Sequence, residues 1–84
     1  MDVAFTGEAF ETFLEWQKTD KQIFRKIIAL ITDTYREPFT GLGKPEPLKH
    51  DLSGCWSRRI TDEHRLVYTI EQNTVKVISC KYHY

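Results

Sequence analysis

EPFTGLGKPEP, residues 37–47, separates two parts of the chain whose apolar residues recur with different periods. It contains all three prolines of the 84-residue chain and two of its four glycines. Proline and glycine at such close spacing interrupt helices and strands alike. We therefore expect a loop here, with helices before it and strands after it.

Upstream of this loop, apolar side chains recur at the three- and four-residue spacing of amphipathic helices. We expect a first helix to begin at Gly7, with Thr6 as its N-cap. A second helix is expected to begin at Thr19, because TDKQ (residues 19–22) matches a capping box, and to stop before Pro38. With so little chain between them, the two helices should form a hairpin. Their apolar stripes contain Phe10, Phe13 and Leu14 in the first helix, and Ile23, Ile27, Leu30 and Ile31 in the second.

Downstream of the loop, four short segments have the composition of strands and are separated by turn sequences, namely residues 48–52, 55–60, 65–70 and 75–82. Short connections favour antiparallel hairpins, so these segments should form a meander. Residues 3–6 are expected to add a short edge or terminal strand. The sequence thus predicts a single α+β domain over residues 1–84, with two N-terminal helices packed on one face of an antiparallel sheet.

The alternation of side chains along the expected strands divides them between two faces. Most large apolar residues have even numbers, and we expect these to face the helices: Trp56, Ile60, Leu66, Tyr68, Ile70, Ile78, Cys80 and Tyr82. The opposite face should then carry Ser57, Arg59, Arg65, Val67, Val75, Val77, Lys81 and His83. A β-bulge would exchange the two faces beyond it. One face is therefore predicted to be apolar, and the other to gather basic and titratable groups.

The net charge is zero, but it is unevenly spread. Residues 1–20 contain five acidic residues and one basic residue, a net charge of −4, whereas residues 21–84 contain eleven basic and seven acidic residues, a net charge of +4. Such asymmetry indicates a polyanionic partner.

Two cysteines are too few for a disulfide framework, and no zinc-binding spacing is present. Cys55 and Cys80 are expected on opposite faces of strands that are not neighbours, and therefore unpaired. The sequence has neither a secretory signal nor an apolar stretch long enough to span a bilayer. We expect a reduced cytoplasmic protein without membrane association, cofactor or metal.

The candidate chemical groups are few, because no ordered Ser–His–Asp set, P-loop or GxGxxG motif is present. What remains is Glu46 in the loop, His83 beside the C-terminus, and the basic residues Lys44, Lys49, Arg58, Arg59 and Arg65. A base, a cation and an acid suffice to cleave RNA, which supplies its own nucleophile in the 2′-hydroxyl. Structural interpretations stay open for each residue: a solvated carboxylate, an arginine paired with Asp62 or Glu63, and a histidine at a frayed chain end.

Residues 43–68, GKPEPLKHDLSGCWSRRITDEHRLVY, together with the segment WQKTDK and the ending KYHY, resemble the YoeB (Txe/YoeB) toxins of bacterial type II toxin–antitoxin systems. The resemblance covers essentially the whole chain and implies the RelE-like, microbial-ribonuclease-like fold. It implies that Glu46 is the general base, His83 the general acid and Arg65 the cation that stabilises the transition state. It also implies supporting RNA-contact or positioning roles for Lys49, Arg59 and Tyr84. Cys55 stands where a bulkier apolar residue is expected, which concerns packing rather than chemistry.

The function implied by this resemblance is a ribosome-dependent endoribonuclease that cuts mRNA in the ribosomal A site and stops translation. A YefM-like antitoxin would neutralise it with a segment that folds on binding, and a homodimer is expected. Three alternatives remain: a ParE-like gyrase inhibitor with the same fold, an RNA-binding module that does not cleave, and an inactive copy. The joint presence of Glu46, Arg65 and His83 favours the nuclease over the gyrase inhibitor.

Overall fold

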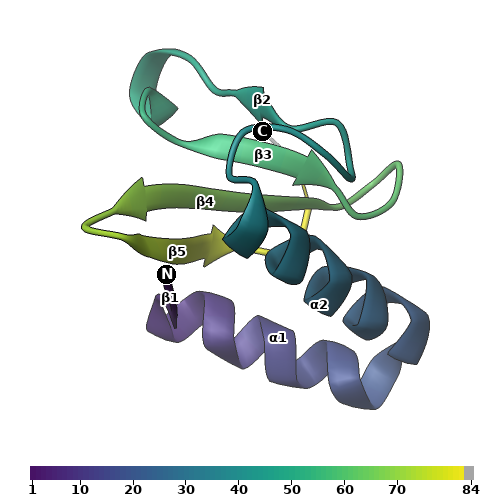
Figure 1. Ribbon diagram of the computed structural model, residues 1–84. Coiled ribbons are helices and arrows are strands. Elements are labelled where there is room, and N and C mark those ends of the chain that lie inside the picture. The colour runs from purple at the N-terminus through teal and green to yellow at the C-terminus, as the bar shows by residue number, and fades with distance from the viewer. Residues whose placement is uncertain (83–84) are drawn as a thin grey trace.

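The computed structural model describes residues 1–82 and places two helices on one face of a five-stranded sheet (Figure 1). This arrangement confirms the predicted α+β class. The helices are α1 (Gly7–Thr19) and α2 (Lys21–Arg36), and a short 3₁₀ helix, η1 (His50–Leu52), follows the loop. The strands are β1 (Asp2–Phe5), β2 (Glu46–Pro47), β3 (Trp56–Arg59), β4 (Arg65–Glu71) and β5 (Thr74–Ser79).

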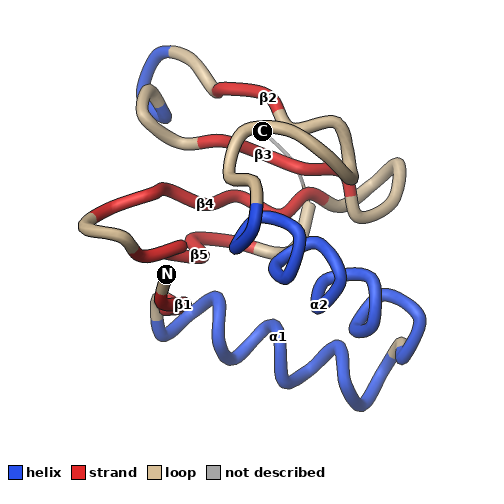
Figure 2. Tube along the Cα trace, in the orientation of Figure 1, coloured by secondary structure: helices blue, strands red, loops and turns tan. Residues whose placement is uncertain are grey.

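The strands lie in the order β1-β5-β4-β3-β2 (Figure 2). β3, β4 and β5 form three strands of the predicted four-stranded antiparallel meander, and β2 pairs antiparallel with β3. β1 is an edge strand, as expected, but it runs parallel to β5, with Phe5 opposite Val77. This parallel pair makes the sheet mixed, and it places the start of α1 beside the end of β5.

The start of α1 follows the prediction, whereas the start of α2 does not. Thr6 caps α1 by accepting a hydrogen bond from the N–H of Ala9 (3.1 Å). Thr19 is the last residue of α1, and Asp20 caps α2 by accepting from the N–H groups of Gln22 and Ile23. An aspartate carboxylate can accept from both amides of the first turn, so it takes the cap position from the preceding threonine. Within residues 1–82, neither helix is long and apolar enough to cross a membrane.

The prediction of a strand over residues 48–52 is wrong. The strand in this region is β2, which lies just upstream, and the chain then turns through η1. His50 has a φ of 59°, in the left-handed region that no strand residue adopts. The N–H of Leu48 donates to the carbonyl of Cys55 (2.9 Å), which closes this turn onto the beginning of β3.

The core lies between the two helices and the sheet. Ala9 from α1 and Ile27 and Leu30 from α2 are buried against apolar side chains of the strands. Six of the residues predicted to face the helices belong to this core or pack against it, namely Trp56, Ile60, Leu66, Tyr68, Ile70 and Cys80. Ile78 and Tyr82 do not belong to it, and Tyr82 is 58% exposed.

The prediction fails at Val75 and Val77, which lie between the β4–β5 turn and a bulge in β5, because Glu71 pairs with Thr74 and so places odd-numbered residues of β5 beside even-numbered residues of β4. Tyr68 pairs with Val77 and Val67 pairs with Ser79, so β5 has one extra residue between the two pairs. Val75 and Val77, predicted to face away from the helices, are fully buried in the core instead. An extra residue exchanges the faces of a strand because side chains alternate with a period of two.

Candidate active site

Glu46, Arg59 and Arg65 lie on the face of the sheet that points away from the helices. Glu46 of β2 is opposite Ser57 of β3, and Arg59 of β3 is opposite Arg65 of β4. Residues that are directly opposite each other share a face, as do residues two apart on one strand. The register therefore brings these three side chains together around Ser57, and it confirms the predicted face for Ser57, Arg59 and Arg65.

The distance between these residues leaves room for a ligand between the carboxylate of Glu46 and the guanidinium of Arg65. With strands roughly 4.8 Å apart and residues roughly 3.4 Å apart along a strand, the Cα atoms of Glu46 and Arg65 are about 12 Å apart. Their long side chains can approach a phosphodiester from two sides. Glu46, Arg59 and Lys49 are exposed, and Lys49 directly precedes η1. The structure thus brings one carboxylate and two arginines to one face of the sheet, and Lys49 follows Glu46 by three residues.

The guanidinium of Arg65 is held by main-chain oxygens of the turn between β3 and β4. Its Nη1 donates to the carbonyls of Thr61 (2.6 Å), His64 (3.1 Å) and Asp62 (3.2 Å). Within residues 1–82, the alternative ion pair with the carboxylate of Asp62 or Glu63 is not formed. Carbonyl oxygens carry no net charge, so they fix the position of this arginine without neutralising it. A fixed, uncompensated cation suits the binding of a phosphate.

The chain end is tied to the same strand edge as Arg65. The indole N–H of Trp16 donates to the carbonyl of Cys80 (3.0 Å), and the backbone N–H of Arg65 donates to the carbonyl of Tyr82 (2.9 Å). The backbone N–H of Tyr82 donates to Nδ1 of His64 (2.8 Å). The chain therefore reaches residue 82 directly beside Arg65. The predicted site residues His83 and Tyr84 follow immediately and lie outside the described residues.

A buried arginine organises the loop that leads to Glu46. Arg58 is fully buried, and its guanidinium pairs with Asp33 of α2 (Nη1 to Oδ2, 2.6 Å). The Nε group donates to the hydroxyl of Tyr68 (3.1 Å), which in turn donates to the carbonyl of Pro38 (2.7 Å). The remaining donations are to carbonyls of the loop: Glu37 (2.6 Å), Thr40 (2.9 Å) and Leu42 (3.1 Å).

This role of Arg58 escapes the sequence reasoning, which places the residue in a general basic set. The available signal is the Arg58–Arg59 pair itself, because adjacent strand residues point to opposite faces. One arginine of such a pair must enter the core, where it needs acceptors.

Asp33 ties the same loop to α2. The N–H of Leu42 donates to Oδ2 of Asp33 (2.9 Å). This hydrogen bond and the Arg58 guanidinium lower the pKa of the Asp33 carboxyl below its ordinary value of 3.8. Next along the loop, the carbonyl of Gly43 accepts from the N–H of Arg59 (2.7 Å). Gly43 has a φ of 78°, and a Cβ there would lie 2.8 Å from Cδ2 of Leu30, so only glycine fits between α2 and β3.

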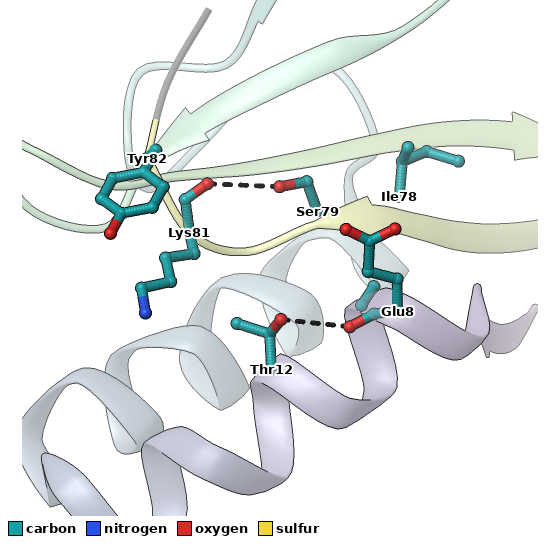
Figure 3. Close-up of a pocket in the computed structure, with 7 residues that line it drawn as sticks. Glu8, Thr12, Ile78, Ser79, Lys81 and Tyr82 are labelled. Atoms are coloured by element: carbon teal, nitrogen blue, oxygen red, sulfur yellow. Dashed lines mark hydrogen bonds between the residues drawn. The ribbon is translucent and has the colours of Figure 1, made fainter.

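A separate pocket lies on the helix side, between α1 and the end of β5 (Figure 3). Lys81 lines it and points toward α1, with its Nζ 3.9 Å from Oε1 of Glu15 and near the ring of Trp16. The prediction that Lys81 shares the face of Arg59 and Arg65 is therefore wrong. The other lining residues are Glu8, Ala9, Thr12, Ile78, Ser79 and Tyr82.

Neither cysteine is bonded to the other, as predicted: Cys80 is buried in the core and Cys55 is half-buried. Burial raises the pKa of the Cys80 thiol to about 11. Among residues 1–82, no group of three or more His, Cys, Asp or Glu side chains is placed to hold a metal ion.

Comparison with known proteins identifies the family. Residues 5–84 match the family described as YoeB-like toxin of bacterial type II toxin-antitoxin system. The chain belongs to the YoeB toxin family. It is 55% identical to Toxin YoeB of Escherichia coli K12 over 84 residues, which is the full length of both chains. It is also 50% identical over 82 residues to Toxin RelK of Mycobacterium tuberculosis, covering 98% of this chain and 96% of the relative.

The fold, like the sequence, is similar to that of solved YoeB structures. The YoeB/ParE toxin from Agrobacterium tumefaciens superposes with a TM-score of 0.97 at 46% identity, over the full length of both chains. The YoeB chain of the Staphylococcus aureus YoeB–YefM complex superposes with a TM-score of 0.92 at 45% identity, over 100% of this chain and 98% of that one. A YoeB dimer from the same organism gives a TM-score of 0.93 at 46% identity, with the same coverage. The family resemblance noted in the sequence is therefore confirmed, together with the RelE-like fold.

Proposed function

We propose that this YoeB-family toxin is a ribosome-dependent endoribonuclease that cuts mRNA in the ribosomal A site and thereby inhibits translation. The observation that carries the proposal is the open sheet face on which Glu46, Arg59 and Arg65 come together. The anchoring of Tyr82 to Arg65 supports it further, since the chain arrives beside Arg65 just before His83.

In this mechanism the RNA supplies the nucleophile and the protein supplies the proton transfers. Glu46 removes the proton of the 2′-hydroxyl, and O2′ attacks the adjacent phosphorus. Arg65 stabilises the charge of the phosphorane, and His83 donates a proton to the departing 5′-oxygen. The products are a 2′,3′-cyclic phosphate and a 5′-hydroxyl. Each acid–base partner contributes about 10²–10⁴ in rate, and no metal is required because the side chains supply base, cation and acid.

Substrate binding is assigned to residues that do not transfer protons. Arg59 lies opposite Arg65, Lys49 follows Glu46 by three residues, and both are exposed, so their charges suit the phosphate backbone of mRNA. Tyr84 is assigned to the same supporting role. The net charge of +4 over residues 21–84 gives this part of the chain the sign that a nucleic acid requires.

We further propose a YefM-like antitoxin and a second copy of the chain as its protein partners, and the cytoplasm as its location. The similarity to the Staphylococcus aureus YoeB–YefM complex and to the YoeB dimer supports both partners. The antitoxin segment would cover the basic face, because a chain that blocks this face also blocks mRNA.

The experiment is to incubate the protein with ribosomes programmed with a defined mRNA and to map the mRNA ends. We expect a cut at the A-site codon, and a rate lower by about 10²–10⁴ for Glu46→Gln, which keeps the shape but loses the base. Glu11→Gln, at an exposed position on α1, is the matched control and should cleave normally. Ribosome binding without a cut would favour a non-cleaving RNA-binding module, and inhibition of gyrase would favour a ParE-like toxin. Either result would contradict the proposal.

A further inference from the structure

His64 is a buried histidine that stands between α1 and the end of the chain. Only 7% of the residue is exposed. Its ring lies 4.9 Å from the ring of Trp16, edge to face, and 5.5 Å from the ring of Tyr82. These two aromatic rings fix the plane of the imidazole, so its nitrogens point in defined directions.

Both ring nitrogens have defined surroundings. Nδ1 accepts the backbone N–H of Tyr82 at 2.8 Å, so it carries no proton and the ring proton is on Nε2. Nε2 faces Oε1 of Glu63 at 3.6 Å. The imidazole therefore accepts a hydrogen bond from the main chain, which an apolar ring packed at the same place could not do.

The residue that His64 holds is in a conformation that needs support. Tyr82 has a φ of 59°, in the left-handed region that a bulky aromatic residue rarely adopts. Its N–H is bonded by His64 and its carbonyl by the backbone N–H of Arg65. The consecutive residues His64 and Arg65 thus bond both backbone groups of Tyr82, and these two hydrogen bonds hold Tyr82 in its left-handed conformation.

These hydrogen bonds link two groups of the proposed reaction, the cation and the general acid. Arg65 carries the cation, and the residue after Tyr82 is His83, the proposed acid. The direction in which the chain leaves Tyr82 determines where His83 starts. His64 touches neither the substrate nor the reacting atoms, but it orients the main chain from which the acid departs.

We propose that His64 is a positioning residue, which places the general acid by accepting the N–H of Tyr82 at Nδ1. This inference rests on the proposed function, since it assumes that His83 protonates the leaving oxygen. Misplacement of a reacting group by about 1 Å can cost about 10²-fold in rate, so loss of this acceptor should be visible in kcat.

The test compares two variants of nearly equal shape. His64→Asn keeps an acceptor oxygen at the place of Nδ1, whereas His64→Leu does not. Both lose the imidazole, and the leucine avoids burying an unpaired amide, so we expect His64→Leu to be at least as stable as His64→Asn. We expect the opposite order in kcat, with His64→Leu lower than the parent by about 10²-fold and His64→Asn restoring most of the rate. KM should change little in either variant. If cleavage instead follows stability, His64 has only a structural role.

A second substrate identifies the step that is affected. In an mRNA with sulfur in place of the 5′-oxygen at the cut, the leaving thiolate departs without needing a proton. The defect of His64→Leu should then largely disappear. A defect of the same size on this substrate would overturn the proposal.

A third measurement does not depend on cleavage. Hydrogen exchange of the Tyr82 amide should be faster in His64→Leu than in His64→Asn, and equal exchange in the two variants would also overturn the proposal. If the parent protein does not cleave mRNA at all, the proposed function fails. The exchange measurement then still decides whether His64 holds the chain end.

Discussion

Removal of the Arg58 side-chain charge should strongly destabilise the fold. In Arg58→Met the stem is kept and the guanidinium is lost, so the partners left without it are Asp33, the Tyr68 hydroxyl and three loop carbonyls. Breaking a fully buried ion pair by removing one partner costs roughly 3–5 kcal/mol, and this pair contributes less because the side chain of Asp33 is 27% exposed. A hydrogen bond to a charged group contributes about 1.5–3 kcal/mol. These contributions overlap because all of them belong to one guanidinium, so we take about 3–5 kcal/mol for the whole.

A loss of this size is large for a small domain, whose total free energy of unfolding is about 5–15 kcal/mol. At about 4–8 °C per kcal/mol, the melting temperature should fall by about 12 °C or more. Arg58→Lys should lie between the parent and Arg58→Met, because a single ammonium can reach Asp33 but cannot span the separate loop carbonyls. Arg59→Met, at the exposed neighbouring position, is the matched control and should melt close to the parent protein.

The assay is thermal and urea unfolding of the three variants beside the parent, with hydrogen exchange at the N–H of Leu42 as a local probe. This amide donates to Asp33, which Arg58 holds, so its exchange should be faster in Arg58→Met. If Arg58→Met unfolds within a few degrees of Arg59→Met, the loop is held by other contacts and the reasoning from the buried guanidinium is wrong.

Four further predictions concern titration, thiol labelling and charge. Because the pKa of Asp33 is lowered in the folded state, the unfolded chain takes up this proton first as the pH falls. The stability that Asp33 contributes is therefore present above about pH 4 and lost on acidification, and Asp33→Asn should flatten the acid limb of a stability–pH curve. Because burial raises the pKa of Cys80 to about 11 from 9.0, its stabilising contribution is complete below pH 9 and lost as the pH rises through 11. Cys80→Ala should flatten that alkaline decline, and a thiol reagent should label Cys55 well before Cys80 in the native protein. Arg65→Lys should impair cleavage about as much as Arg65→Ala, because an ammonium cannot bond the turn carbonyls and a phosphate in the same geometry, and a Lys variant with near-parental cleavage would reduce the arginine to a general positive charge.

The elements that depend on neighbours in the sequence were predictable. The Thr6 cap, both helices and three of the four predicted strands of the meander follow from spacing and turn residues within a few positions. The cap of α2 was misplaced by one residue, because the side chains of Thr19 and Asp20 both suit a cap and only the local geometry selects Asp20. The prediction of a strand over residues 48–52 failed because His50 has a left-handed backbone, which is uncommon even for histidine, one of the residue types enriched in that region.

Features that depend on distant contacts were not predictable. Alternation placed Arg59 and Arg65 correctly because the pairing of β3 with β4 is regular. It failed at Val75 and Val77 because the pairing of Glu71 with Thr74 across the turn places odd-numbered residues of β5 beside even-numbered residues of β4, and a bulge after Val77 exchanges the faces again before Cys80. Arg58 could be assigned to the buried side, but its partner Asp33 lies 25 residues away in the sequence. Only the folded chain brings the two together.

The most direct test of the proposed chemistry replaces the 2′-hydroxyl by hydrogen at the single nucleotide whose ribose precedes the cut, in an mRNA bound to programmed ribosomes. If Glu46 acts by activating that hydroxyl, the all-ribose mRNA is cut to leave a 2′,3′-cyclic phosphate, or the 3′-phosphate formed from it, and the substituted mRNA stays intact at that position. Cleavage of the substituted mRNA at the same position, or a 3′-hydroxyl on the upstream product, would contradict the account.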